Sequence, residues 1–420
     1  MTTSSSALTD TEFAALARHS VDLILRLQDD SGAYPASPTF SAYRGYSWFR
    51  DGAFIADAVS AFGAAESAGR FHDWCSRILV ERAGLVGDVV AGARAGTPVA
   101  DERMLATRFT FDGAEGSDEW WDFQLDGYGT WLWAVVEHAA RHGESIERWR
   151  PAIELAVDYL VHSWERPCFD WWEEHSSQVH VSTLGCIAAG LRAAESVVDA
   201  DRADACADAV ARIRALIARE GMVDGHLAKW LGSTEVDASL ASLVSPLGLY
   251  PATGAAGRAT IAALDDALAV DGGVHRYLDD TFYGGGQWPL LSCFLGLAYA
   301  DAGDPDRARA LLEWAASTAT PDGDVPEQVP DHLLFPERRQ EWIEKWGTVA
   351  TPLLWSHAMI VRLWVRLGQN RGSGTALSAA VTRTPSTPSS GAPSSPSPGS
   401  RSRSACGPPV RSRASSSSTP

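Results

Sequence analysis

Phe169-Asp-Trp-Trp-Glu-Glu-His175 lies between Ala152–Ser163 and Thr183–Val198, two segments in which apolar residues recur at helical spacing. A simple surface loop would favour small polar residues, whereas this one is dense in tryptophan and carboxylates. We expect it to connect two helices and to lie at one end of a helical body.

The same alternation of helix and aromatic, acidic loop recurs along most of the chain. Helical spacing of apolar residues predicts further helices over Phe13–Leu27, Phe54–Ala65, Gly129–Ala140, Ala205–Ala218, Ala259–Ala269, Leu290–Ala300, Ala308–Ala316 and Pro352–Leu367. The other aromatic and acidic loops are Tyr43–Asp51, Phe109–Asp126, His275–Trp288, Val325–Trp355 and, more weakly, Trp230–Asp237. Because such loops return after every second helix, we predict an all-α fold, an (α/α)6 barrel of about six helical hairpins with the loops converging at one end.

The composition suits a large folded body that acts on a small neutral substrate. Of 420 residues, 45% are hydrophobic, and 35 Lys and Arg stand against 53 Asp and Glu. The formal net charge of -18 would repel nucleic acid and acidic membrane surfaces, so we expect neither as a partner. The 17 tryptophans indicate stacking against flat apolar faces such as those of sugars, although several of them must belong to the core.

The N-terminus and the cysteines bear on the compartment. Met1–Asp10 is polar and rich in Ser and Thr, unlike a signal peptide, and no apolar run is long enough to span a membrane. The six cysteines are scattered without close pairs or histidine partners, which argues against a zinc site and a disulfide framework. We expect a cytoplasmic protein without metal or cofactor; the sequence indicates no oligomeric state.

The composition changes at Arg371, beyond which Ser, Pro, Gly and Arg dominate and Asp, Glu and Trp are absent. We therefore predict a folded domain over residues 1–370 and a disordered tail over residues 371–420. A frame-shifted reading of GC-rich coding sequence would give the same abrupt onset, and the sequence does not separate these explanations.

Two loop glutamates have surroundings suited to acid–base chemistry. Glu173 follows two tryptophans, whose apolar rings would raise the pKa of a carboxyl by desolvation, as a proton donor at neutral pH requires. Glu327 follows a proline in Val325-Pro-Glu-Gln328. Read alone, the first is more often part of a solvated helix start, and the second of a turn or helix cap. Hydrolysis of a glycosidic bond needs such a pair, one to protonate the leaving oxygen and one to activate water.

Three further clusters combine aromatic rings with polar groups. Tyr46-Ser-Trp-Phe-Arg-Asp51 offers directed donors and acceptors for sugar hydroxyls, although an Arg–Asp ion pair at a helix start is about as common. Trp120-Trp-Asp-Phe-Gln-Leu-Asp-Gly127 repeats the combination. His275-Arg-Tyr277 adds a second arginine, and Tyr283-Gly-Gly-Gly-Gln-Trp288 adds a glycine run that lacks the features of a phosphate loop.

In their residue types and in their order along the chain, these clusters resemble the motifs of glycoside hydrolase family 15, the glucoamylase-like family, over Tyr43 to Leu367. The resemblance implies an exo-acting, inverting hydrolase that releases β-D-glucose from short α-1,6- or α-1,4-linked gluco-oligosaccharides. A trehalase of the same family would share the motifs. A non-hydrolytic toroid protein, either a sugar epimerase or a binding protein, would share the helices and tryptophans, but His175, His275 and His357 do not form a recognisable acid–base pair for an epimerase.

The resemblance also implies a role for each glutamate and for three neighbours. Glu173 is expected to be the general acid and to hold its proton, and Glu327 is expected to be the ionised general base. Arg50 and Asp51 are expected to bind the non-reducing-end glucose, with Arg276 as a further ligand.

The remaining candidates for substrate binding form the walls of the expected pocket. Glu174 would contact the sugar on the leaving-group side, and either Tyr43 or Tyr46 would support the base. Phe282 stands where many relatives have a second tyrosine, which removes a hydroxyl near the base. The other expected substrate-binding residues are Trp48, Trp120, Asp126, Trp172 and Trp355.

Overall fold

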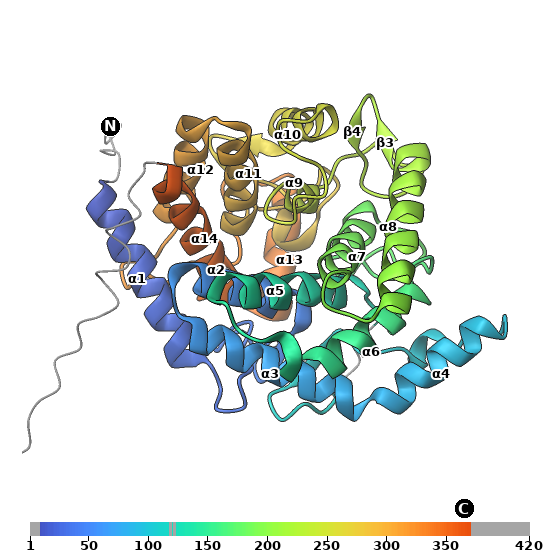
Figure 1. Cartoon of the computed structure of the whole chain (residues 1–420). Helices are drawn as coiled ribbons and strands as arrows, with labels where there is room; N and C mark the ends of the chain where they lie inside the picture. Colours follow the sequence, from blue (N-terminus) through green and yellow to red (C-terminus); the bar gives the residue numbers. More distant parts are fainter. Residues whose placement is uncertain (1–8, 117–119, 121–122, 371–420) are drawn as a thin grey trace, which may run out of the picture. The chain divides into compact units, whose positions relative to one another are not determined.

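The computed structural model describes residues 9–116, 120 and 123–370 (Figure 1). The chain divides into two units, Met1–Val381 and Thr382–Pro420, and everything described below belongs to the first. The predicted tail and most of the polar N-terminal segment lie outside the described residues.

The described part is mainly helical. Its α-helices are α1 (Asp10–Leu27), α2 (Phe49–Phe62), α3 (Ala65–Glu81), α4 (Ala83–Arg94), α5 (Asp126–His142), α6 (Arg150–Val161), α7 (Val181–Ala194), α8 (Ala200–Glu220), α9 (Ala241–Val244), α10 (Ala255–Leu268), α11 (Pro289–Ala302), α12 (Pro305–Ser317), α13 (Pro336–Trp346) and α14 (Leu354–Asn370). Short 3-10 helices are η1 (Asp101–Arg103), η2 (Ile146–Arg148), η3 (Ala238–Leu240) and η4 (Phe282–Gly284). Three two-stranded antiparallel sheets pair β1 (Tyr46–Trp48) with β2 (Arg108–Thr110), β3 (Met222–Val223) with β4 (His226–Leu227), and β5 (Ala269–Val270) with β6 (Gly273–Val274).

Six of the described helices form a closed inner ring, in which α2, α5, α7, α9, α11 and α14 each contact the next and α14 returns to α2. The outer layer packs α1 on α14, α3 on α2, α6 on α5, α8 on α7, α10 on α9 and α11, and α12 on α11 (Figure 1). The predicted (α/α)6 fold is therefore confirmed. None of the described helices is both long and apolar enough to cross a membrane.

The two layers differ in their apolar pattern. Every residue from Phe49 to Ser60 of the inner helix α2 is buried, as expected for a helix covered on all sides. The outer helix α8 buries only Cys206, Ala209, Ile213 and Ile217, a single stripe at spacings of three and four. The amphipathic stripe places α8 on the outside, and the continuous apolar run places α2 inside.

Helices α5 and α7 approach each other closely at a pair of glycines. A Cβ atom on Gly190 would lie 2.2 Å from the carbonyl oxygen of Gly129. A residue with a Cβ atom would not fit at this position without separating the two inner helices. The glycines therefore allow the close approach of α5 and α7.

The aromatic loops meet because each precedes an inner helix. The loops end at the N-termini of α2, α5, α7, η3 with α9, α11 and α14, so they gather at the end of the barrel where these six helices begin. Helix α2 begins at Phe49, earlier than the predicted Phe54, which brings Arg50 and Asp51 into its first turn. Helices α3, α4, α9 and α13 were not predicted. Helix α4 buries only Val86 and Val89, and α13 only Trp342, so neither has a core stripe to reveal it, and α9 has only four residues. Helix α3 does bury an apolar stripe and was missed.

Candidate active site

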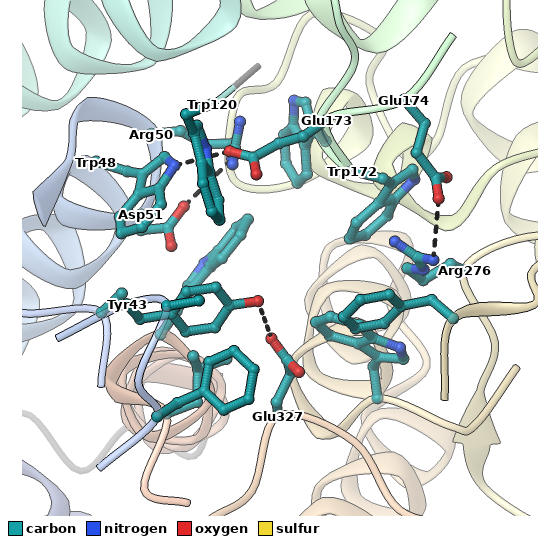
Figure 2. A pocket seen from close by; sticks show the side chains of 18 of the residues that line it. Tyr43, Trp48, Arg50, Asp51, Trp120, Trp172, Glu173, Glu174, Arg276 and Glu327 are labelled. Atoms are coloured by element: carbon teal, nitrogen blue, oxygen red, sulfur yellow. Dashed lines mark hydrogen bonds and ion pairs between the residues drawn. The ribbon is translucent and has the colours of Figure 1, made fainter. Parts of the chain in front are cut away.

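A pocket of about 970 Å³, including its open mouth, is lined by the loops that precede the inner helices (Figure 2). Aromatic rings and charged groups make up most of its wall. The lining residues are Ala36, Phe40, Ala42, Tyr43, Trp48, Arg50, Asp51, Trp120, Trp171, Trp172, Glu173, Glu174, Arg276, Phe282, Trp288, Glu327, Trp346, Leu353 and Trp355. Rings and carboxylates together suit a sugar, which presents flat apolar faces and many hydroxyls.

Glu173 reaches the pocket from a loop with an unusual backbone. Its φ of +66° lies in the left-handed region, which non-glycine residues seldom adopt. The loop is held by Asp170, whose Oδ1 accepts the backbone N–H groups of Trp172 and Glu174, both at 2.9 Å. The resulting turn directs the Glu173 side chain into the pocket (Figure 2).

The carboxyl of Glu173 is partly buried and receives two N–H donors. Its Oε1 accepts hydrogen bonds from the indole Nε1 of Trp48 at 2.8 Å and from the side-chain amide of Gln124 at 3.3 Å. The donors come from strand β1 and from the loop before α5, both far away in the chain, so the orientation of this carboxyl depends on three separate segments.

Glu327 lies across the pocket from Glu173 and is almost completely buried, with 2% of its surface exposed (Figure 2). Its backbone N–H donates to the carbonyl of Ala350 at 2.9 Å, and its Oε1 accepts the hydroxyl of Tyr43 at 2.9 Å. Its Oε2 is buried without a hydrogen-bond partner in the described structure, and the residue lines the pocket. Burial raises the pKa of Glu327 to about 7, although the hydrogen bond from Tyr43 lowers it.

Arg50 and Asp51 occupy one side of the pocket, next to Trp48 (Figure 2). The Nε of Arg50 pairs with Oδ1 of Asp51 at 3.2 Å, and its Nη1 donates to Oδ2 of Asp126 at 3.0 Å and to Gln124 at 2.7 Å. Burial raises the pKa of Asp51 to about 6, although Arg50 beside it lowers that pKa. The result is a rigid, desolvated donor and acceptor pair.

Glu174 and Arg276 face each other on the opposite side of the pocket (Figure 2). Glu174 accepts the hydroxyl of Tyr277, and its Oε1 lies 3.7 Å from Nη2 of Arg276. Asp280 binds Arg276 in a forked arrangement that includes an Nε–Oδ2 bond of 2.8 Å. Trp172 stands beside this group, with the Arg276 guanidinium 5.1 Å from its ring centroid.

Most candidates from the sequence meet in this pocket, and two lie behind its wall. Tyr46 pairs with Thr110 in the β1–β2 sheet, and its ring lies 3.8 Å from the Arg108 guanidinium, so the structure places Tyr43 and not Tyr46 on Glu327. Asp126 is fully buried and reaches the pocket only through Arg50, which corrects its expected place as a direct substrate contact.

Several lining residues were missed by the sequence reasoning. Trp171 and Trp288, and Gln124 behind them as a hydrogen-bond donor to Glu173, stand inside motifs that the sequence singled out, so those motifs contained the signal that could have found them. Trp346 lies in the predicted loop Val325–Trp355 but was not singled out as a pocket residue, and Phe40 stands outside the predicted loops, where its only signal was its aromatic character. No described group of three or more His, Cys, Asp or Glu could hold a metal ion.

The histidines that an epimerase would need do not line the pocket. His275 Nδ1 contacts the carbonyl of Gly285 at 2.9 Å. His357 is fully buried and accepts the backbone N–H of Val325 on Nε2 at 2.9 Å, so its Nδ1–H donates to Ser20. These two histidines support loops, and the titratable groups in the pocket wall are mainly carboxyls.

Comparison with known proteins agrees with this geometry. The family model for glycosyl hydrolases family 15 matches residues 13–329. An isomaltose glucohydrolase of Kribbella flavida is 56% identical over 356 residues, which cover 84% of this chain and 92% of that protein. A trehalase of Mycolicibacterium smegmatis is 27% identical over 321 residues, 69% of this chain and 47% of the trehalase.

Solved structures give the same relationship. A wild-type glycosidase is 56% identical with a TM-score of 0.84, covering 86% of this chain and 99% of its own. A variant glycosidase in complex with glucose is 55% identical with the same TM-score and coverage. A glucoamylase from Saccharomycopsis fibuligera is 14% identical with a TM-score of 0.65, covers 89% of this chain and 99% of its own, and shares the fold. The chain is therefore a glycoside hydrolase and belongs to glycosyl hydrolases family 15.

Proposed function

We propose that this enzyme is an exo-acting, inverting α-glucosidase that releases β-D-glucose from short α-linked gluco-oligosaccharides, with isomaltose as its preferred substrate. The observation that carries the proposal is the approach of Glu173 and Glu327 from opposite sides of one aromatic pocket (Figure 2). The substrate follows from the 56% identical relative named isomaltose glucohydrolase.

In the proposed reaction the two carboxyls act on opposite faces of the same sugar. Glu173 donates its proton to the glycosidic oxygen as the bond to the anomeric carbon breaks. Glu327 removes a proton from a water molecule that attacks this carbon from the other face, which inverts the α-linkage to β-glucose. The unpartnered Oε2 of Glu327 supports this role, because it is free to accept a hydrogen bond from that water.

The binding groups divide between the two sugars. Arg50 and Asp51, with Trp48 beside them, would hold the hydroxyls of the non-reducing-end glucose. Glu174 and Trp172 would contact the leaving sugar on the opposite side, and Arg276 beside them would be a further ligand of the terminal glucose. Such a division fits an enzyme that removes one terminal glucose at a time.

The test measures kcat/KM on isomaltose, maltose, panose, trehalose and soluble starch. NMR spectra recorded early in the reaction identify the anomer of glucose that is released first. We expect isomaltose to give the highest kcat/KM and β-glucose to appear first. Initial α-glucose would exclude inversion, and a preference for trehalose would make the enzyme a trehalase.

We also propose a cytoplasmic location. The cysteines of the described residues are free and buried, as in proteins kept in a reducing compartment. Fractionation of the producing cells tests this proposal, which predicts the activity in the cytosolic fraction and not in the medium.

A further inference from the structure

Lys229 and Asp237 lie behind the pocket wall, in the loop between β4 and η3 that the sequence marked as a weak member of the aromatic, acidic set. Their exposed fractions are 2% and 3%, and neither lines the pocket. Nζ of Lys229 lies 3.8 Å from Oδ2 of Asp237. Burying two charges is costly unless other contacts compensate, so their other contacts indicate what this pair does.

Asp237 holds the indole ring of Trp172. The ring Nε1–H donates to both carboxylate oxygens of Asp237, at 2.9 Å to Oδ2 and 3.1 Å to Oδ1. The carboxylate is itself fixed, because Oδ1 also accepts the backbone N–H of Ser239 at 2.9 Å and its hydroxyl at 2.6 Å. Trp172 therefore has one orientation in the pocket wall.

Lys229 acts on the neighbouring wall residue, Tyr277. Its Nζ lies 2.9 Å from the centroid of the Tyr277 ring, a close cation–π contact. The hydroxyl of Tyr277 donates to Oε2 of Glu174, which also faces Arg276. A cation over the ring withdraws electron density from the phenol and makes its O–H more acidic. The hydroxyl of Tyr277 is therefore a stronger hydrogen-bond donor to Glu174.

We propose that Lys229 and Asp237 form a buried positioning pair that orients Trp172 and Glu174 and thereby sets recognition of the leaving sugar. The proposal rests on the proposed function, which places these two wall residues on the leaving-group side. It goes beyond that function by assigning a specificity role to two residues that never touch the substrate.

The experiment compares two substrates that share the terminal glucose but differ in the leaving group. Isomaltose carries a leaving sugar, whereas α-D-glucosyl fluoride carries only a fluorine. For Lys229→Met we expect kcat/KM on isomaltose to fall about 10- to 100-fold, because a displaced binding group costs this much. On the fluoride we expect kcat/KM to stay within about threefold of wild type.

A double-mutant cycle with Glu174→Gln shows whether Lys229 acts through Glu174. In that background Lys229→Met should lower kcat/KM on isomaltose by less than about twofold, because the group it orients has already been changed. Arg362→Met is the matched control, since it breaks a buried ion pair with Asp57 (Nε–Oδ2 2.7 Å) away from the pocket. It should lower Tm and leave the ratio of the two kcat/KM values unchanged.

Asp237→Asn is the second variant, for the case in which Lys229→Met does not fold; it should show the same selective loss on isomaltose. Equal losses on both substrates, no loss on either, full additivity with Glu174→Gln, or unfolding of both variants would overturn the proposal. If wild-type enzyme cleaves another disaccharide instead of isomaltose, the proposed substrate is wrong, and the same ratio measured with that disaccharide still decides the role of the pair.

Discussion

The carboxyl of Glu327 is 2% exposed and accepts one protein hydrogen bond, from Tyr43, whereas the carboxyl of Glu173 is partly exposed and accepts two, from Trp48 and Gln124. The backbones differ as well, because Glu173 has a left-handed φ of +66°. The acidity of the Glu327 carboxyl is thus set mainly by desolvation, and its Oε2 has no hydrogen-bond partner among the described residues. The orientation of the Glu173 carboxyl is set by a strained turn and by donors from other segments.

This difference refines the roles expected from the sequence. Glu327 was expected to be ionised, yet burial raises its pKa to about 7, so it is close to half protonated at neutral pH. A base with a pKa near the working pH is an efficient one. Its protonation then limits activity on the acid side.

The largest effect should come from Glu327→Gln. Without a base no substrate can be attacked by activated water, so we expect kcat to fall at least about 10³-fold on both isomaltose and α-D-glucosyl fluoride. Stopped-assay glucose release measures the loss, and circular dichroism checks the fold. Substantial turnover of either substrate would assign the base to another group.

Glu173→Gln should separate the two carboxyls. We expect kcat on isomaltose to fall by about 10³-fold, because its leaving oxygen needs a proton. Fluoride is a far better leaving group, so hydrolysis of the glucosyl fluoride should drop by less than about tenfold. Equal loss on the two substrates would contradict the role of Glu173 as acid.

The pH profile tests the burial of Glu327. In wild type, kcat/KM should decline below a midpoint of about 7 as the base takes up a proton. Tyr43→Phe removes a donor that lowers this pKa, so the midpoint should move to higher pH, and activity at pH 6 should fall by about tenfold. A midpoint that stays in place or moves down would show that Tyr43 does not act on Glu327.

The last prediction concerns stability and not activity. Because the folded-state pKa of Glu327 is above its ordinary value of 4.5, the folded protein binds the extra proton between pH 4.5 and about 7 and loses stability as pH rises through this window. Glu327→Gln cannot titrate and escapes this loss. As pH rises from 4 to 8, its free energy of unfolding should therefore increase by up to about 3 kcal/mol relative to that of the wild type. Thermal unfolding of both proteins at these pH values measures it; a Tm difference that does not change with pH would contradict the shift.

The motif around Arg50 shows how far sequence reasoning reached. Residue types and order in Trp48-Phe-Arg-Asp51 were sufficient to identify a binding cluster. Successive residues of a helix point in different directions, so the early start of α2 buries Phe49 in the core and turns Arg50 and Asp51 to the pocket. That start was misplaced by five residues in the sequence reading because the polar pair interrupts the apolar pattern.

Tyr43 and Tyr46 show where sequence reasoning ended. Both precede the same motif and carry the same hydroxyl, and the sequence does not choose between them. Pairing of β1 with β2 turns Tyr46 towards Arg108, while Tyr43 is left facing Glu327. The choice depends on strand pairing across some sixty residues, which no local pattern contains.

By itself, the sequence determined the helical layers, the loops that carry chemistry and the pair of glutamates, because apolar spacing and residue type are local properties. The tertiary structure alone decided which side chains of the converging loops line the pocket, that Glu327 is buried and Glu173 is not, and that Lys229 and Asp237 stand behind Trp172 and Tyr277. Burial, and the pKa and orientation that follow from it, depend on which distant segments cover a side chain.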